Sequence, residues 1–143
     1  MYRSIKAHIT DIVIARLDHN CDLYEAILQL AKDNEITLGK VEAIGAVKKA
    51  TIAYYDQTEK KYEELTIDEH LEITSLIGNI SQRDKAIALH AHVNLGAKDG
   101  RIVGGHLLPG TPVFACEVML SRCEGPPLMR EFDDTTRLPL WKL

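Results

Sequence analysis

The stretch between residues 90 and 106 constrains the fold of this chain more than any other. It holds His90, His92 and His106, three of the six histidines in the sequence. Side chains alternate between the two faces of a strand, so His90 and His92 share one face if this stretch is extended. His106 follows after a polar turn, and the pattern therefore favours a β-hairpin that carries three imidazoles.

The loop of this hairpin decides whether the third histidine joins the other two. We expect the three-residue loop Lys98-Asp99-Gly100, because such loops usually end in a glycine with left-handed backbone. Ala97 then pairs with Arg101, and His92 lies opposite His106. A two-residue loop shifts the register by one position and turns His106 to the other face. The three-residue loop thus predicts that all three imidazoles point to one side.

Three imidazoles on one side of a hairpin are typical of a Zn²⁺ site with water or substrate at the fourth position. Zinc is favoured over copper or nickel by geometry and availability rather than by affinity. The predicted ligands are His90, His92 and His106; the alternative is that strand histidines form local hydrogen bonds or face solvent. Gly104-Gly105 indicates a close approach of backbones beside the metal, or a bulge at a subunit contact.

One segment has the periodicity of an amphipathic helix. Leu23, Ile27 and Leu30 recur at helical spacing up to about Asp33, and Asn20 is the predicted N-cap. The other regular segments have the pattern of strands. The predicted strands cover residues 2–8, 11–17, 43–47, 51–55, 61–67, 71–81, 86–95, 113–121 and 128–132. We therefore predict an α+β fold, a mostly antiparallel β-sheet with one main helix, in a single domain over residues 1–143.

Composition narrows the classes of function. The net charge of −4 argues against a nucleic-acid interface, which usually shows a basic footprint. The three cysteines form no C-x-x-C pair, which predicts free thiols and a cytoplasmic location. The first residues lack the apolar stretch of a signal peptide, and no apolar run approaches the ~20 residues of a membrane span.

Glu117 is the only charged residue on an otherwise apolar predicted strand. A carboxylate is costly to bury unless it is paired. Glu117 could orient a ligating histidine or act as a general base on a metal-bound water. The alternative is a structural ion pair with Arg16, Arg101 or Arg122. Arg16 is itself a candidate anion-binding residue near the metal, with Asp22 fixing the loop; the alternative for Arg16 is an ordinary surface arginine. For Asp22 we favour a helix-start carboxylate that interacts with the helix dipole.

Several motifs together resemble the plant-and-prokaryote-conserved (PPC) domain: residues 71–80, the H-x-H pair, residues 104–110 and Glu117-Val118. The similarity covers roughly residues 3–131. It implies a single α+β domain that assembles as a homotrimer. It also implies a fold similar to that of acetolactate decarboxylase, an enzyme that holds zinc with histidines.

Prokaryotic members of this family are often described as predicted DNA-binding proteins. That description derives from plant relatives that carry an Arg-Gly-Arg-Pro segment, which this sequence lacks. The resemblance thus implies a zinc-binding module with a regulatory or DNA-binding role. The alternative is a zinc-dependent enzyme, a lyase or hydrolase, that acts on a small oxo- or hydroxy-acid with Glu117 and Arg16 as catalytic residues. A third hypothesis is a structural trimer in which the histidines only pack.

Overall fold

The computed structural model describes residues 1–143 and contains one helix and ten strands. The elements in chain order are β1 (His8–Leu17), α1 (Leu23–Asp33), β2 (Gly39–Val47), β3 (Ala50–Asp56), β4 (Lys61–Ile67), β5 (Leu71–Arg83), β6 (Ala86–Gly96), β7 (Ile102–Leu107), β8 (Val113–Glu124), β9 (Arg130–Asp133) and β10 (Leu138–Trp141). Eight strands form one antiparallel sheet in the order β1-β8-β2-β5-β6-β7-β3-β4. The predicted α+β class is confirmed.

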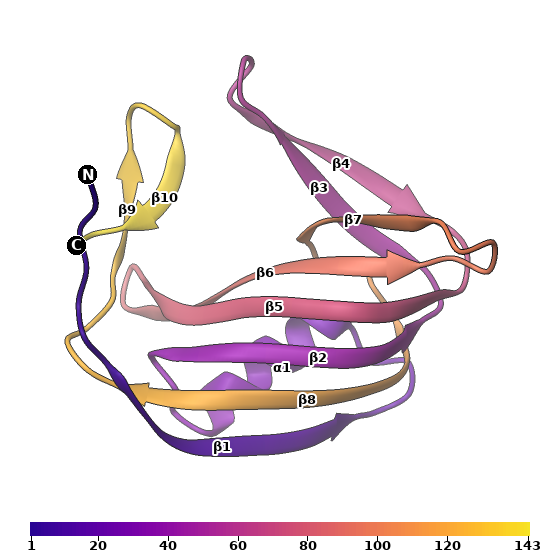
Figure 1. The fold of residues 1–143 in the computed structure, drawn as a ribbon, viewed down its shortest axis with the longest axis horizontal. Coiled ribbons are helices and arrows are strands. Elements are labelled where there is room, and N and C mark those ends of the chain that lie inside the picture. Colours follow the sequence, from indigo (N-terminus) through magenta and orange to yellow (C-terminus); the bar gives the residue numbers. More distant parts are fainter.

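The remaining two strands, β9 and β10, form a separate hairpin near the end of the chain. In Figure 1 this hairpin rises near the start of β6, on the opposite side of the molecule from β3 and β4. The helix α1 lies behind the sheet in the same view. The histidine-bearing part of β6 therefore lies between two hairpins that stand on either side of it.

The side chains of β6 point alternately to a packed face and to an open face of the sheet. Leu89, Ala91 and Val93 are buried with the helix side of the sheet, whereas His90 and His92 point to the opposite face. We call this opposite face the outer face. On the inner face, the helix buries Leu23, Ile27 and Ala31 completely, whereas Leu30 is partly buried. Burying an aliphatic side chain contributes roughly 1.5–3 kcal/mol, so this inner layer holds the fold together.

The helix forms where its periodicity predicts, but its cap is a different residue. Asp22 is the N-cap, since its Oδ1 accepts a hydrogen bond from the backbone N–H of Glu25 at 3.0 Å. Its Oδ2 accepts from the N–H groups of Gly110 (2.7 Å) and Thr111 (2.8 Å). The predicted cap at Asn20 is wrong, because that residue adopts φ 69° in the preceding turn. The helix is too short and too polar to cross a membrane.

The observed strands depart most clearly from the predicted ones near the two ends of the chain. The predicted strand 2–8 contributes only His8, because β8 ends at Glu124, its register partner. The following residues, 125–127, contain two prolines, which cannot donate to a ladder. Conversely, residues 138–141 form a strand despite Pro139. Proline is tolerated there because β10 pairs with β9 alone and so has a free edge.

The β6–β7 hairpin has the predicted register. Ala97 donates to the carbonyl of Arg101 at 2.8 Å, and Gly100 donates to the carbonyl of Ala97 at 2.9 Å. Gly100 has φ 83°, the left-handed conformation that closes a three-residue loop. His92 is therefore the register partner of His106. The loop chemistry alone was enough to place the third histidine opposite the second.

The two adjacent glycines of β7 allow its neighbours to come close. A Cβ on Gly104 would lie 2.5 Å from the carbonyl oxygen of Val93, on β6. A Cβ on Gly105 would lie 2.7 Å from the carbonyl oxygen of Ala53, on β3. The register of β6 with β7 has no bulge. The predicted close backbone approach is confirmed, and it sets the position from which His106 projects.

Candidate metal centre

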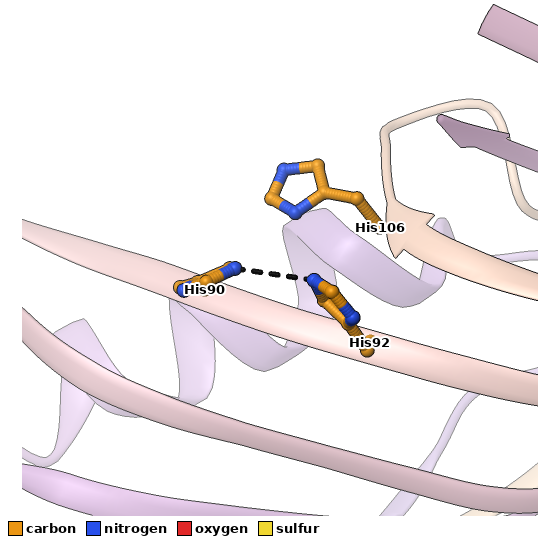
Figure 2. Close-up of side chains that lie close together, drawn as sticks. All are labelled: His90, His92 and His106. Carbon is orange, nitrogen blue, oxygen red and sulfur yellow. Dashed lines mark hydrogen bonds between the residues drawn. The ribbon is translucent and has the colours of Figure 1, made fainter. Parts of the chain in front are cut away.

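The three histidines of the hairpin converge on the outer face of the sheet. His90 and His92 project from β6 and His106 from β7, and their ligand atoms all lie within 4.8 Å of one another. Nε2 of His90 lies 3.3 Å from Nε2 of His92. Figure 2 shows this pair and a ring nitrogen of His106 directed toward it. The predicted convergence of the three imidazoles is confirmed.

The arrangement fits a metal ion by two independent criteria. Tetrahedral zinc at about 2.0–2.1 Å from each nitrogen places two ligand nitrogens about 3.3 Å apart, which is the separation of the His90 and His92 atoms. Nδ1 of His106 is buried and has no hydrogen-bond partner. An unsatisfied buried polar atom costs about 1–3 kcal/mol, and a bound cation would remove that cost.

The electrostatic environment keeps two of the rings unprotonated. Burial, followed by the neighbouring His106, Arg130 and His92, lowers the pKa of His90 from 6.5 to about 4. Burial, followed by His92 and Arg130, also lowers the pKa of His106. Both rings are neutral at pH 7, so their lone pairs are available to a metal without release of a proton.

Two further side chains border the cluster, and neither was predicted from the sequence. The ring of Tyr62, on β4, stacks on His106 with centroids 5.0 Å apart. Nη2 of Arg130, on β9, lies 3.5 Å from Nδ1 of His90. No local pattern marks either residue, because each reaches the site only through the tertiary placement of its hairpin.

These residues also line a pocket beside the cluster. The pocket has a volume of about 530 Å³ and is bordered by His90, His106, Tyr62 and Arg130. This size lies within the range of about 300–1,000 Å³ typical of small-molecule sites. The three-histidine cluster is therefore accessible to a ligand from one side.

Arg16 and Glu117 occupy a different part of the outer face. They are register partners on β1 and β8, and both are exposed. Glu117 forms no ion pair, either with Arg16 or with the other two candidate arginines, Arg101 and Arg122, which pair with other acids. Strands β2 and β5 separate β8 from β6. Three strand spacings amount to about 14 Å, so one chain does not bring Glu117 to the histidines.

A single helix on one face of an eight-stranded antiparallel sheet, with three convergent histidines on the other, defines the class of this protein. The model of the Plants and Prokaryotes Conserved (PCC) domain family matches residues 5–124. The chain therefore belongs to this family, the PPC domain that its motifs resemble.

Solved structures of similar proteins share the fold over nearly the whole chain. A metal-containing protein from Archaeoglobus fulgidus has a TM-score of 0.94 and 39% identity, over 99% of this chain and 100% of the other. A PPC protein from Pyrococcus horikoshii has a TM-score of 0.91 and 29% identity, over 100% and 98%. A proposed DNA-binding protein from Bacteroides thetaiotaomicron has a TM-score of 0.87 and 26% identity, over 97% and 96%.

A curated relative is much longer than this chain. The bifunctional protein GlmU of Synechococcus sp. (strain JA-3-3Ab) is 30% identical over 102 residues, which are 70% of this chain. The similar region spans only 15% of that protein. The similarity thus concerns one part of a larger molecule.

Proposed function

We propose that this chain is a single PPC domain, over residues 1–143, that binds one Zn²⁺ through His90, His92 and His106. The observation that carries the proposal is the convergence of three imidazoles, one of which, His106, has a buried Nδ1 without a hydrogen-bond partner. The description of the similar Archaeoglobus fulgidus protein as metal-containing supports it. Three histidine ligands with free space next to them are typical of zinc sites that keep one coordination position open for water or a substrate.

A zinc ion in such a site supplies Lewis-acid activation of a bound oxygen ligand. The chain itself supplies the surroundings of that position. Tyr62 holds the ring of His106 by stacking, which limits its rotation. Arg130 places a positive charge next to His90. These two residues shape the pocket from which a ligand approaches.

Metal analysis of untagged protein tests this proposal. We expect about one zinc per chain after mild purification, as a mononuclear site requires. His92→Ala and His106→Ala should lose the metal, while His70→Ala, at an exposed position outside the cluster, should retain it. Zinc content that is equal in all four proteins, or absent from the wild type, contradicts the proposal.

We further propose a homotrimer with a cytoplasmic location. The outer face carries an exposed apolar patch of Ile14, Ile44, Ile77 and Met119, which we call the outer patch. Contiguous apolar surface of this kind marks interaction sites. The three cysteines are free, as a reducing compartment allows.

A regulatory role that includes DNA binding is the family-based candidate. Its support is the description of similar proteins from Bacteroides thetaiotaomicron and Ralstonia eutropha as proposed DNA-binding proteins. Binding that uses phosphate contacts must weaken steeply with salt. A gel shift at two salt concentrations decides this point, and the absence of retardation at moderate salt removes DNA from the proposal.

The alternative is a zinc-dependent lyase or hydrolase acting on a small oxo- or hydroxy-acid. The pocket beside the cluster favours it. Glu117 and Arg16 serve as catalytic residues only if a neighbouring copy brings them to the histidines, because within one chain β2 and β5 intervene. Turnover of a panel of 2-oxo and 2-hydroxy acids tests this function. Activity that survives in His92→Ala protein contradicts it.

A further inference from the structure

Arg130 is a half-buried cation without an acidic partner. Its Nε donates to Ser81 Oγ at 2.8 Å, and Nη1 donates to the carbonyl of Pro139 at 2.9 Å. Its Nη2 donates to Asn79 Oδ1 at 2.8 Å and contacts His90 Nδ1 at 3.5 Å. Every one of these partners is neutral. The contacts fix the direction of the guanidinium but leave its charge unbalanced.

The ring of Trp141, whose centroid lies 5.6 Å from Cζ of Arg130, offers a cation–π contact but no negative charge. The only acid that lines the pocket around Arg130 is Asp84, which lies 3.6 Å from the guanidinium of Arg83 at the rim. Arg83 and Asp84 thus balance each other and leave Arg130 as the net charge of the pocket. A divalent cation bound by the three histidines would add two more positive charges. Positive charge withdrawn from water is costly unless an anion accompanies it.

Metal binding also frees donors on Arg130. The distance of 3.3 Å between Nε2 atoms places Nε2 of His90 on the ion side. In a neutral ring that ligates through Nε2, Nδ1 carries the hydrogen and cannot accept. Nη2 then loses its contact with His90, and Nη1 has a second N–H beyond the one given to Pro139. Two N–H groups on the two ends of the guanidinium fork are left for a ligand.

The remaining walls of the pocket are mostly apolar. They include Ile87 on β6, Leu138 and Leu140 on β10, and the ring of Tyr62. A fully hydrated inorganic anion gains nothing from such walls, whereas an alkyl chain buried there gains about 0.8 kcal/mol per methylene. The lining therefore favours an anion with an apolar body.

We propose that Arg130 is the anion-recognition residue of this pocket, which takes a small monocarboxylate with an apolar body whose carboxylate binds the Arg130 guanidinium beside the proposed metal site. The inference rests on the proposed metal site. Arginine suits this role because its planar fork matches a carboxylate. Arg130, on the β9–β10 hairpin, thus replaces Arg16, on β1, as the candidate anion-binding residue.

Calorimetric titration of the zinc-loaded full-length protein with acetate, butanoate, hexanoate, butanamide and inorganic phosphate tests the proposal. Affinity should rise from acetate to hexanoate by at most about fourfold per methylene. Butanamide, the neutral analogue of butanoate, should bind at least tenfold more weakly. Phosphate binding that equals or exceeds butanoate binding, or an affinity that does not change with chain length, overturns the proposed ligand class.

Variants separate the role of Arg130 from that of the metal. Arg130→Gln should bind butanoate roughly 10- to 100-fold more weakly, as expected for a lost charged hydrogen bond. Arg137→Gln makes the same charge change in the same hairpin but outside the pocket lining, and should leave the affinity unchanged. If Arg130→Gln does not fold, Arg130→Lys keeps the charge without the fork and should still weaken binding several-fold.

The outcomes also distinguish the two proposals. A wild-type protein that takes up no zinc contradicts the proposed metal site. Zinc-loaded Arg130→Gln and Arg130→Lys proteins that bind butanoate as tightly as the wild type overturn the inference alone. A wild-type protein that takes up zinc but binds no butanoate also overturns the inference alone.

Discussion

At the scale of single residues, the charge state of His90 links the site to the stability of the fold. Burial is the largest cause of its low pKa of about 4, and the positive charge of Arg130 adds to the effect of the neighbouring rings. In the unfolded chain the same side chain has a pKa of about 6.5. Below that value the unfolded state of the metal-free protein binds more protons than the folded state.

We predict that the metal-free protein becomes less stable as the pH falls from about 6.5 toward about 4, the two pKa values of His90. A depressed histidine pKa contributes stability that is complete above the unfolded value and is lost toward the folded value. Urea unfolding in the presence of a chelator, at steps of pH across this window, measures the slope. His90→Gln should show a flatter slope than the wild type, and His70→Gln should not. Identical slopes in all three proteins would show that His90 does not titrate between the two states.

At the scale of elements, strand β7 is held between two neighbours that leave no room for side chains at its centre. The carbonyl oxygens of Val93 and Ala53 approach its two glycines from opposite sides. A methyl group at either glycine must push a backbone away rather than a flexible side chain. The position of His106, one residue further along, depends on this tight packing.

We predict that Gly105→Ala destabilises the fold by about 1–3 kcal/mol, the usual cost of overpacking. Zinc affinity should fall at the same time, because the displaced strand moves His106. Gly96→Ala is the matched control, since its new Cβ would meet the methyl end of the Thr74 side chain at 3.1 Å. Chemical denaturation and zinc titration measure the two effects. A Gly105→Ala protein as stable as Gly96→Ala contradicts the argument.

The elements also show what the sequence can and cannot predict. Loop chemistry and strand alternation are local, so they sufficed to bring His90, His92 and His106 together. Tyr62 and Arg130 come from hairpins whose placement depends on the order of strands in the sheet, which no local pattern encodes. Both Asn20 and Asp22 satisfy the preferences of an N-cap. The tertiary contacts of Asp22 with the loop after β7, which the sequence pattern does not show, help to fix Asp22 as the cap.

At the scale of the whole molecule, the sheet has one covered face and one open face. The helix covers the inner face. On the outer face, Ile44 and Ile77 of the outer patch are 57% and 59% exposed. A concavity of about 630 Å³ on this face is lined by these two residues together with Arg16 and Glu117. A second copy that covered the patch would therefore also enclose the two charged residues that a single chain leaves in solvent.

We predict that Ile44→Glu converts the proposed trimer into monomers. A charge at the centre of an apolar interface must lose its water without a partner. Sedimentation equilibrium should give three times the chain mass for the wild type and one chain mass for the variant. Ile102→Glu, which is 58% exposed but lies outside the outer patch, is the control and should remain trimeric. A monomeric wild type contradicts the proposal directly.

All three candidate ligands belong to one β-hairpin, and this has a consequence for how the protein unfolds. An ion held by His92 and His106 closes a short chain loop, much as a disulfide would, and so removes conformational entropy from the unfolded ensemble. Such a cross-link holds the two strands in register even when the rest of the sheet has separated. With the proposed ion bound, the hairpin would open only as fast as the ion departs, so the rate of metal release would limit the rate of local unfolding.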